Sequence, residues 1–365
     1  MTAIADDLAL RTAIPRPDEE DSVELLDGGG QAFPLMLAEI DRAERHVHLE
    51  MYALELDDVG RRFVKALQEA ARRGVTVRVT LDGWGSLRSG ATAVAQLRAA
   101  GCRARIHNRF SRMLLGRVGC NHRKLLVVDG RVAFLGGINI GRRFETWDDL
   151  AVWIRGPACT ELVHALDGER APKLRQRVRF LLSGFREGMA LRREYLEAIA
   201  GARDRALIAH SYFLPGHGML RAIQAAARRG VTVTLLLPHA SDVRLATFGT
   251  RRLYRRLLDA GVRIHELTGR MMHAKAAVVD GKVSLVGSFN LDPLSMTNLE
   301  VLVRVEDTAF GQKVEQWVAS RLPHSIRVAT SPRSESGIKD RAADLLGLCV
   351  RRFAFWLADW LSRHG

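Results

Sequence analysis

The feature that most constrains this chain is a phrase that occurs twice with every gap the same. Both copies follow the pattern H-x-K-x4-D-x6-G-[GS]-x-N, at residues 122–139 and again at residues 273–290. Six matched positions at fixed spacing are very improbable by chance. The duplication predicts two lobes built to one plan, each with its own histidine and lysine.

The sequence around the phrase repeats as well. Residues 71–77 read Ala-Arg-Arg-Gly-Val-Thr-Val, and residues 227–233 read the same letters. In each copy a helical stretch ends in Arg-Arg, a glycine ends the helix, and a β-branched strand follows. Strand and helix alternate in both halves, which predicts an α/β fold. We expect two lobes, each a mostly parallel sheet flanked by helices, related by pseudo-twofold symmetry.

The chain divides into five predicted segments. The polar, acidic N-terminus has the composition of a disordered segment, and an arginine-rich stretch between the lobes is either a solvated linker helix or a basic lip over the active site. The predicted boundaries are 1–22 for the N-terminal segment, 23–169 for the first lobe, 170–193 for the basic stretch, 194–323 for the second lobe, and 324–365 for a linker and C-terminal helix.

Charge restricts the class of partner. The net charge of +14 favours a polyanion, which could be nucleic acid or an anionic membrane surface. Charge alone does not choose between the two. The four cysteines are scattered without metal-ligand spacing and are typical of reduced thiols in a cytosolic protein.

The repeated phrase carries the candidate catalytic residues. Residues two apart on a strand face the same side, so His122 projects with Lys124, and His273 projects with Lys275. If the lobes pack face to face, one pocket receives both pairs. The motif also supplies Asp129 and Asp280 to the candidate catalytic set. Each precedes a glycine, however, and Asp-Gly indicates a two-residue hairpin turn, so both aspartates are predicted to be turn formers first.

The end of the phrase supplies candidate phosphate ligands. A hairpin brings Gly137 and Asn139 back toward the first histidine, and Ser288 and Asn290 toward the second. Glycine lets the backbone approach a phosphate closely, and the asparagine amide can donate to an oxygen. Two lysines and two such sets can neutralise phosphate oxygens by fixed positive charge.

A carboxylate follows each histidine at the same offset. Asp149 lies 27 residues after His122, and Glu300 lies 27 residues after His273. Such acids could fix the tautomer of the histidines, or they could be surface acids that happen to recur. We expect no metal and no cofactor, because lysine is not a usual metal ligand and neither motif histidine has a paired histidine or cysteine nearby.

The two copies of the motif resemble those of the phospholipase D superfamily, over about residues 23–323. Within it, the chain is most similar to bacterial cardiolipin synthases that lack N-terminal membrane helices. The passages that carry this closer resemblance are residues 23–33, 81–86, 147–157, 212–215 and 288–292.

The resemblance implies a two-step, metal-independent exchange through a phosphohistidine. By this likeness His122 is the nucleophile, His273 is the acid and base, and Lys124, Lys275 and both asparagines hold the phosphate oxygens. The implied reaction joins two phosphatidylglycerol molecules into cardiolipin and releases glycerol. Its alternatives are a phosphodiesterase or nuclease acting on nucleic acid, a phospholipase D that hydrolyses phospholipid, and a non-catalytic membrane scaffold.

The C-terminal stretch bears on the choice of partner. Residues 342–361 form an amphipathic pattern with arginines on the polar side and tryptophans on the apolar side. Such a helix either lies in a membrane interface or packs on the lobes. No run of 18 uncharged apolar residues occurs in the sequence. We therefore expect a peripheral protein at the cytoplasmic face of the bacterial membrane, with anionic phospholipid rather than nucleic acid as its partner.

Overall fold

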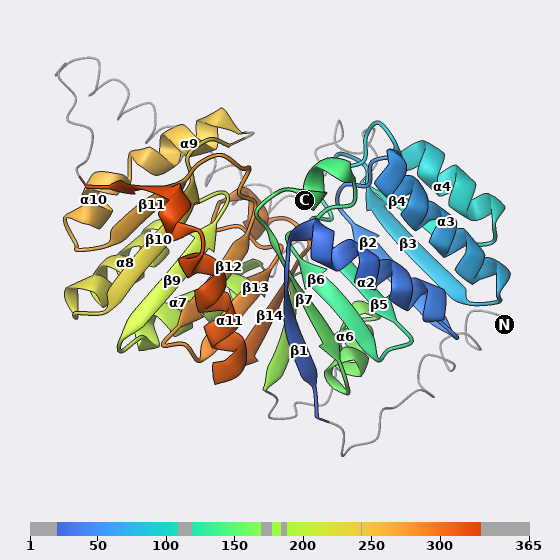
Figure 1. Ribbon diagram of the computed structural model, residues 1–365, viewed down its shortest axis with the longest axis horizontal. Helices are drawn as coiled ribbons and strands as arrows, with labels where there is room; N and C mark the ends of the chain where they lie inside the picture. Colours follow the sequence, from blue (N-terminus) through green and yellow to red (C-terminus); the bar gives the residue numbers. More distant parts are fainter. Residues whose placement is uncertain (1–19, 109–118, 169–176, 184–187, 242, 330–365) are drawn as a thin grey trace. The chain divides into compact units, whose positions relative to one another are not determined.

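The computed structural model describes residues 20–108, 119–168, 177–183, 188–241 and 243–329 (Figure 1). They form two compact units. The first comprises the chain up to Leu182 with residues 286–288 and 299–304, and the second comprises the remainder. The predicted C-terminal helix at 342–361 lies outside the described residues, as do residues 1–19 and, within the basic stretch at 170–193, residues 170–176 and 184–187. No helix among the described residues is long and apolar enough to cross a membrane.

The first unit is built on a sheet of seven strands in the order β1-β7-β6-β5-β2-β3-β4. Strands β2, β3 and β4 run parallel, whereas β5, β6, β7 and β1 join through antiparallel pairs. The strands are β1 (Ser22–Asp27), β2 (His46–Met51), β3 (Thr76–Asp82), β4 (Arg103–His107), β5 (Lys124–Val128), β6 (Val132–Gly136) and β7 (Leu150–Arg155).

Helices cover both faces of this sheet. On one face, α2 (Gly28–Arg42), α3 (Asp58–Arg72) and α4 (Gly90–Ala99) lie side by side over the strands (Figure 1). Their apolar side chains share one core with the alternate residues of β2, Val47 and Leu49. The other face carries α6 (Ala158–Leu166). A 3₁₀ turn, η1 (Arg142–Glu145), precedes β7.

The eight-stranded sheet has the order β15-β11-β10-β9-β12-β13-β14-β8. Strands β9, β10 and β11 are parallel, and β12 and β15 join them antiparallel. Its strands are β8 (Val178–Ser183), β9 (Arg205–His210), β10 (Thr232–Pro238), β11 (Arg263–Leu267), β12 (Lys275–Val279), β13 (Val283–Gly287), β14 (Glu300–Glu306) and β15 (Ser325–Val328).

The helices of the second unit follow the same plan. Helix α7 (Gly188–Gly201) covers the face of β9 that carries His210, because Tyr195 and His210 are in ring contact at 5.5 Å. Helix α11 (Thr308–Ala319) covers the opposite face, where Glu315 pairs with Arg205. The remaining helices are α8 (His217–Arg228), α9 (Arg244–Arg251), α10 (Tyr254–Leu258) and the 3₁₀ turns η2 (Leu294–Met296) and η3 (Leu322–His324).

The predicted two-lobed α/β class is confirmed, but the first sheet is mixed rather than mostly parallel. Only the β2–β3 and β3–β4 pairs are parallel in it. The physical reason is the repeated phrase itself, which folds as the hairpin β5–β6. A two-residue turn can join only antiparallel strands, so the motif imposes an antiparallel half on the sheet.

The Asp-Gly steps form the turns that the sequence predicts. Asp129 and Gly130 have φ angles of 51° and 65°, and Asp280 and Gly281 have φ angles of 52° and 61°. Positive φ at both central residues is the signature of a type I′ hairpin turn. Aspartate tolerates the left-handed region better than most residues, and glycine does so without strain.

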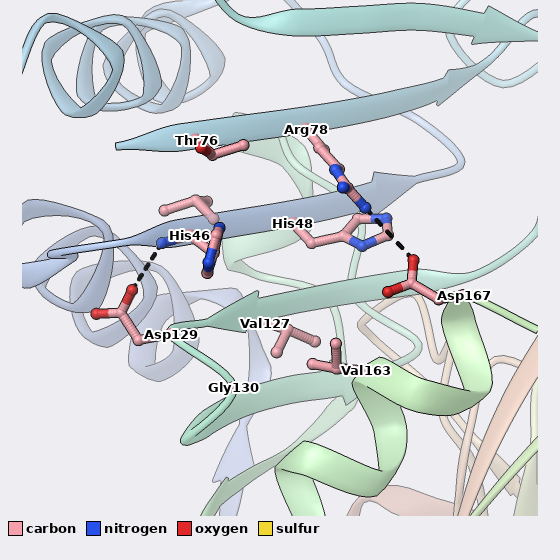
Figure 2. A pocket seen from close by; sticks show the side chains of 10 residues that line it. His46, His48, Thr76, Arg78, Val127, Asp129, Gly130, Val163 and Asp167 are labelled. Carbon is pink, nitrogen blue, oxygen red and sulfur yellow. Dashed lines mark hydrogen bonds and ion pairs between the residues drawn. The ribbon is translucent and has the colours of Figure 1, made fainter. Parts of the chain in front are cut away.

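The two aspartates bind backbone N–H groups. The Asp129 carboxylate accepts hydrogen bonds from the backbone N–H groups of residues 44, 45 and 46 at 2.8–2.9 Å (Figure 2). Asp280 accepts from residues 203, 204 and 205 in the same way. Asp129 is five residues from Lys124 along β5, about 16 Å at the usual strand rise. The structure shows both aspartates in the turn-forming role, and their direct catalytic role stays a prediction.

A small cavity lies beside the Asp129 turn. It is lined by side chains that include His46, His48 and the ion pair between Arg78 and Asp167, whose atoms are 3.4 Å apart (Figure 2). Its volume of about 20 Å³ is enough for one water molecule. It therefore cannot hold a lipid headgroup.

The Asp280 turn makes a testable contribution to stability. Burial alone would raise the pKa of Asp280, but the N–H groups of Asp204, Arg205 and Arg203 lower it below its usual range. The carboxylate therefore stabilises the fold above the unfolded pKa of about 3.9, and this contribution is lost as the pH falls through the folded pKa. Asp280→Ala should lower the free energy of unfolding by about 2 kcal/mol at pH 7, because hydrogen bonds and left-handed tolerance are both lost.

Asp280→Asn is the matched control. Asparagine tolerates the same φ and keeps one acceptor, so it should cost less than alanine, and its difference from wild type should shrink as the pH falls through the folded pKa of Asp280. Denaturant unfolding across pH measures both variants. Turnover per folded molecule should stay within about threefold of wild type. A hundredfold loss of turnover in a stably folded Asp280→Asn variant would show that Asp280 takes a direct part in catalysis.

Candidate active site

The first half-site is built where the chain enters β5. The backbone N–H of His122 donates to the carbonyl of Leu299 at 2.9 Å, and the N–H of Leu299 donates to the carbonyl of Cys120 at 2.9 Å. These bonds align residues 120–122 with the start of β14. A segment that follows the second copy of the motif is thereby fixed beside the histidine of the first copy.

The buried carboxylate of Glu300 holds the His122 ring. Both of its oxygens lie 3.0 Å from His122 Nδ1, and Glu300 has no solvent exposure. Burial alone would raise the pKa of Glu300, but His122, Lys124 and Ser288 together lower it below its usual range. A charged carboxylate at Nδ1 keeps the proton on that nitrogen, which leaves Nε2 as the reactive atom.

The sequence placed a carboxylate at a fixed offset from each histidine, and the structure pairs His122 with the one that follows the other copy. The acid 27 residues after His122 is Asp149, whose Oδ1 accepts from the N–H of Leu150 at 2.8 Å. Asp149 is buried in the same unit, against Gly137. Spacing along the chain does not determine which histidine a carboxylate serves.

Ser288 binds the carboxylate of Glu300. Its fully buried hydroxyl donates to Glu300 Oε2 at 2.5 Å and accepts from the N–H of Val301 at 3.0 Å. In the matching position of the first copy, a Cβ on Gly137 would lie 2.2 Å from Asp149 Oδ1. The roles of Ser288 and Gly137 in phosphate binding stay predictions. Both residues shape the surroundings of a buried carboxylate.

Lys124 and Tyr52 complete the wall around His122. Lys124 Nζ donates to the His122 carbonyl at 2.7 Å and lies 4.9 Å from the centre of the Tyr52 ring. The Tyr52 and His122 rings meet edge to face, with centres 4.8 Å apart. The aromatic ring restricts the imidazole and stabilises the ammonium group. Lys124 is buried, so its charge acts in a site from which most water is excluded.

The side chain of Asn139 is oriented so that its NH₂ group can donate a hydrogen bond. Its Oδ1 accepts from the N–H of Ala53 at 3.1 Å, and the side chain is buried. Because the oxygen is engaged by the backbone, the NH₂ end is the one able to donate to another oxygen. This arrangement suits the predicted part of Asn139 in holding a phosphate oxygen, which remains a prediction.

A polar network that was not predicted from the sequence binds the two residues that flank His122. Glu50, on β2, accepts from Asn121 Nδ2 at 2.9 Å and pairs with Arg123 at 3.3 Å. Arg123 Nε also donates to the backbone carbonyl of Glu300 at 3.3 Å. Burial alone would raise the pKa of Glu50, but His48, Arg123 and Asn121 lower it to about 2.

This network belongs to the first copy alone. The register of the strands places Ala209 where the first copy has Glu50, and the motif places Ala274 where it has Arg123. In the sequence, this difference is visible as an arginine between the histidine and lysine of the first motif and an alanine in the second. The two half-sites therefore differ in how many charges surround the histidine.

The second half-site uses a serine where the first uses a tyrosine. Lys275 Nζ donates to the His273 carbonyl and to Ser211 Oγ, the latter at 3.0 Å. Ser211 Oγ in turn lies 3.2 Å from Asn290 Oδ1. The ring of Tyr212 lies edge to face with His273, with centres 6.1 Å apart. Lysine, serine and asparagine form one connected group.

His210 is a neutral side chain next to Lys275. It pairs with Lys275 across β9 and β12 and is fully buried. Burial and the Lys275 charge lower the pKa of His210 to about 3. The ring is therefore uncharged at neutral pH and does not compete with His273 as an acid.

The predicted site residues thus fall into two sets. The first unit brings together His122, Lys124, Asn139, Ser288 and Glu300, with Asp149 beside Gly137, and the second unit brings together His273, Lys275 and Asn290. That both sets form one pocket stays a prediction. Within the part of the chain that the structure describes, no three His, Cys, Asp or Glu side chains are grouped to hold a metal ion.

Known proteins resemble this chain over most of its length. A family model described as the phospholipase D-like domain of cardiolipin synthase matches residues 36–168 and 195–322. Cardiolipin synthase B of Escherichia coli K12 is 33% identical over 324 residues, which cover 80% of this chain and 78% of that protein. A cardiolipin synthase of Geobacillus kaustophilus is 31% identical over 354 residues, covering 84% of this chain and 70% of that protein.

Solved structures share the fold at low identity. A phosphatidylserine synthase from Haemophilus influenzae matches with a TM-score of 0.69 at 14% identity, covering 98% of this chain and 99% of that one. A polyphosphate kinase from Porphyromonas gingivalis matches with a TM-score of 0.59 at 14% identity, covering 91% of this chain and 53% of that one. At such identity the likeness concerns the fold. The family match over both halves and the two sequence relatives show that this chain belongs to the phospholipase D-like family of cardiolipin synthases.

Proposed function

We propose that this protein is a phosphatidyltransferase of the cardiolipin synthase type, which joins two phosphatidylglycerol molecules and releases glycerol. The observation that carries the proposal is the His122–Glu300 pair, in which a buried carboxylate holds Nδ1 and leaves Nε2 to act. Family membership and the second His-Lys pair, at His273 and Lys275, support it. A phosphatidyl donor and an alcohol acceptor are the substrates that this chemistry requires.

The first step forms a covalent intermediate. His122 Nε2 attacks phosphorus, the P–O bond to the headgroup glycerol breaks, and His273 gives its proton to the departing oxygen. The charge on His122 is met by Glu300. Lys124, Lys275, Asn139 and Asn290 hold the phosphate oxygens, where fixed donors stabilise the negative charge of the transition state.

The second step reverses the roles. The hydroxyl of the second phosphatidylglycerol gives its proton to His273 and attacks phosphorus, and the P–N bond to His122 breaks. Cardiolipin leaves and both histidines return to their starting states. Water as the acceptor in place of this hydroxyl would give hydrolysis, so exclusion of water from the site favours transfer.

A peripheral position on the membrane follows from the substrate. We place the protein at the cytoplasmic face, held by its basic surface and by the amphipathic stretch at 342–361, which lies outside the described residues. The positive charge suits anionic phospholipid.

Phosphatidylglycerol vesicles and DNA, each labelled and incubated separately with purified protein, test the assignment. Cardiolipin and glycerol support it, whereas phosphatidic acid alone or cleaved DNA would replace it with one of the alternatives.

Both histidines should be indispensable. His122→Asn and His273→Asn should each lower kcat/KM by more than about a thousandfold, because each removes either the nucleophile or the acid. Asparagine is preferred to alanine at position 122, since alanine would leave the buried Glu300 charge without a partner and destabilise the fold. Labelled phosphatidyl donor should leave acid-labile label on His273→Asn protein and none on His122→Asn. Activity of either variant within tenfold of wild type contradicts the mechanism.

Ser288 should act through Glu300. Ser288→Ala removes a donor that lowers the pKa of Glu300, so the pKa rises and the charge opposite His122 is less stable. We expect a loss in kcat of about tenfold to a hundredfold, the range of a hydrogen bond to a charged group. The limb of the pH–rate profile that reports His122 should move to lower pH. If that is the acidic limb, His122 is the nucleophile.

Ser284→Ala is the matched control for this variant, because Ser284 is equally buried and lies on β13, the strand that Ser288 directly follows. The sign for stability follows from the lowered pKa of Glu300. The charged Glu300 carboxylate stabilises the fold above its unfolded pKa, and this contribution is lost as the pH falls through its folded pKa. Ser288→Ala should therefore destabilise the fold at pH 7 and destabilise it less at low pH. A Ser288→Ala profile that matches Ser284→Ala would show that the Ser288 hydroxyl has no part in catalysis.

Turnover should not depend on a metal. The charges that face a phosphate here are lysine ammonium groups, and a chelator does not remove them. Cardiolipin formation in excess EDTA should stay within about twofold of the untreated rate, since no bound cation is needed to stabilise the transition state. Near-complete loss that a divalent ion restores would contradict the proposed chemistry.

A further inference from the structure

The turn between β3 and α4 presents two large apolar side chains to solvent. Trp84 is 50% exposed and Leu87 is 60% exposed, three residues apart in residues 83–89. Tryptophan and leucine side chains lose water favourably when buried, so their exposure in one short segment is informative. Arg88 follows directly and is also exposed.

The exposure is built into a rigid turn. The Asp82 carboxylate accepts from the N–H groups of Trp84 and Gly85 at 2.8 Å and 3.0 Å. The N–H of Leu87 donates to the Trp84 carbonyl at 3.3 Å, so both apolar residues belong to one turn. Ser86 Oγ donates to the Tyr52 carbonyl at 3.0 Å and accepts from the backbone N–H of residue 54 at 3.1 Å.

The same turn is tied to the first half-site. Asp82 Oδ2 also accepts from the N–H of Asn121, the residue before His122, at 2.8 Å. Gly85 packs against Tyr52, where a Cβ would lie 2.3 Å from the Tyr52 carbonyl oxygen. The Tyr52 ring in turn contacts His122. The apolar pair is therefore held at the border of the half-site.

One exposed arginine lies in the turn itself, and the sequence that follows the turn is basic. Between Asp82 and Asp129 the sequence contains no acidic residue and nine arginines and lysines. The exposed arginines among the described residues of this stretch are Arg88, Arg98, Arg103 and Arg105, and Arg88 lies in the turn. Apolar side chains next to arginines are typical of segments that lie in a membrane interface. A stacking platform for bases would need aromatic rings, and Leu87 has none.

We propose that residues 83–89 are a membrane-docking turn, in which Trp84 and Leu87 enter the interface of a bilayer that contains anionic phospholipid and Arg88 stays among the headgroups. The proposal rests on the proposed function, because it explains how a phospholipid is brought to the His122 half-site without leaving the bilayer. Phosphatidylglycerol vesicles are the probe, and vesicle binding is measured independently of turnover.

The test compares two variants of the full chain. In Trp84→Ser/Leu87→Ser, binding to phosphatidylglycerol vesicles at physiological salt should weaken at least about tenfold, because two apolar side chains no longer leave water. Ile326→Ser is the matched control, since Ile326 is 52% exposed on β15, and it should bind like wild type. Arg88→Gln should weaken binding about fivefold to these vesicles and hardly at all to phosphatidylcholine vesicles.

Turnover separates docking from chemistry. A short-chain phosphatidylglycerol below its micelle concentration should be turned over by Trp84→Ser/Leu87→Ser within about threefold of wild type, while turnover on vesicles falls with binding. Unchanged vesicle binding overturns the proposal, and so does a loss of DNA binding with vesicle binding intact. Equal losses on soluble and vesicle substrate with normal binding would assign the turn to chemistry. A protein that makes no cardiolipin, yet binds vesicles through this turn, refutes the proposed function and not the docking.

Discussion

The first half-site depends on one buried interaction, the pair formed by His122 and Glu300. Removing a carboxylate from water costs several kcal/mol, and only opposite charge and hydrogen bonds at close range offset that cost. The His122 ring, the Lys124 ammonium and the Ser288 hydroxyl supply them. Each of these groups therefore stabilises the buried carboxylate, in addition to the part we propose for it in the chemistry. Because Glu300 and Ser288 belong to the second half of the sequence, the first copy of the motif is incomplete without that half.

The two copies have diverged in the charges that surround each histidine. Ser288 and Gly137 occupy matching positions, yet only the serine can donate to a carboxylate, and the glycine leaves room for Asp149. The first copy also has the ion pair of Glu50 and Arg123, where the second has two alanines. A histidine beside a fixed carboxylate and a supporting network is held in one orientation. This inequality favours separate duties for the two histidines in one reaction cycle.

The sequence predicted what is local and missed what is brought together by folding. The H-x-K spacing predicted that histidine and lysine lie side by side, and the Asp-Gly step predicted the hairpin, because both depend on neighbours along the chain. The pairing of His122 with Glu300 joins residues 178 positions apart, and both carboxylates lie at the same offset, so no spacing could assign them. The direction of the strands was missed in part because alternation of apolar residues is the same in parallel and antiparallel strands.

The fixed distance between the motif lysine and the motif aspartate has a structural reason. Strand β5 runs from Lys124 to Val128, and Asp129 begins the turn at its far end. The same aspartate binds the first N–H of β2, while the last residue of that strand, Met51, lies opposite Lys124. The turn therefore sets the register of β2 against β5, and with it the position of Tyr52 beside the His122 ring. Asp129 is thereby linked to the site through a strand of fixed length, which gives a structural reason for its fixed place in the motif.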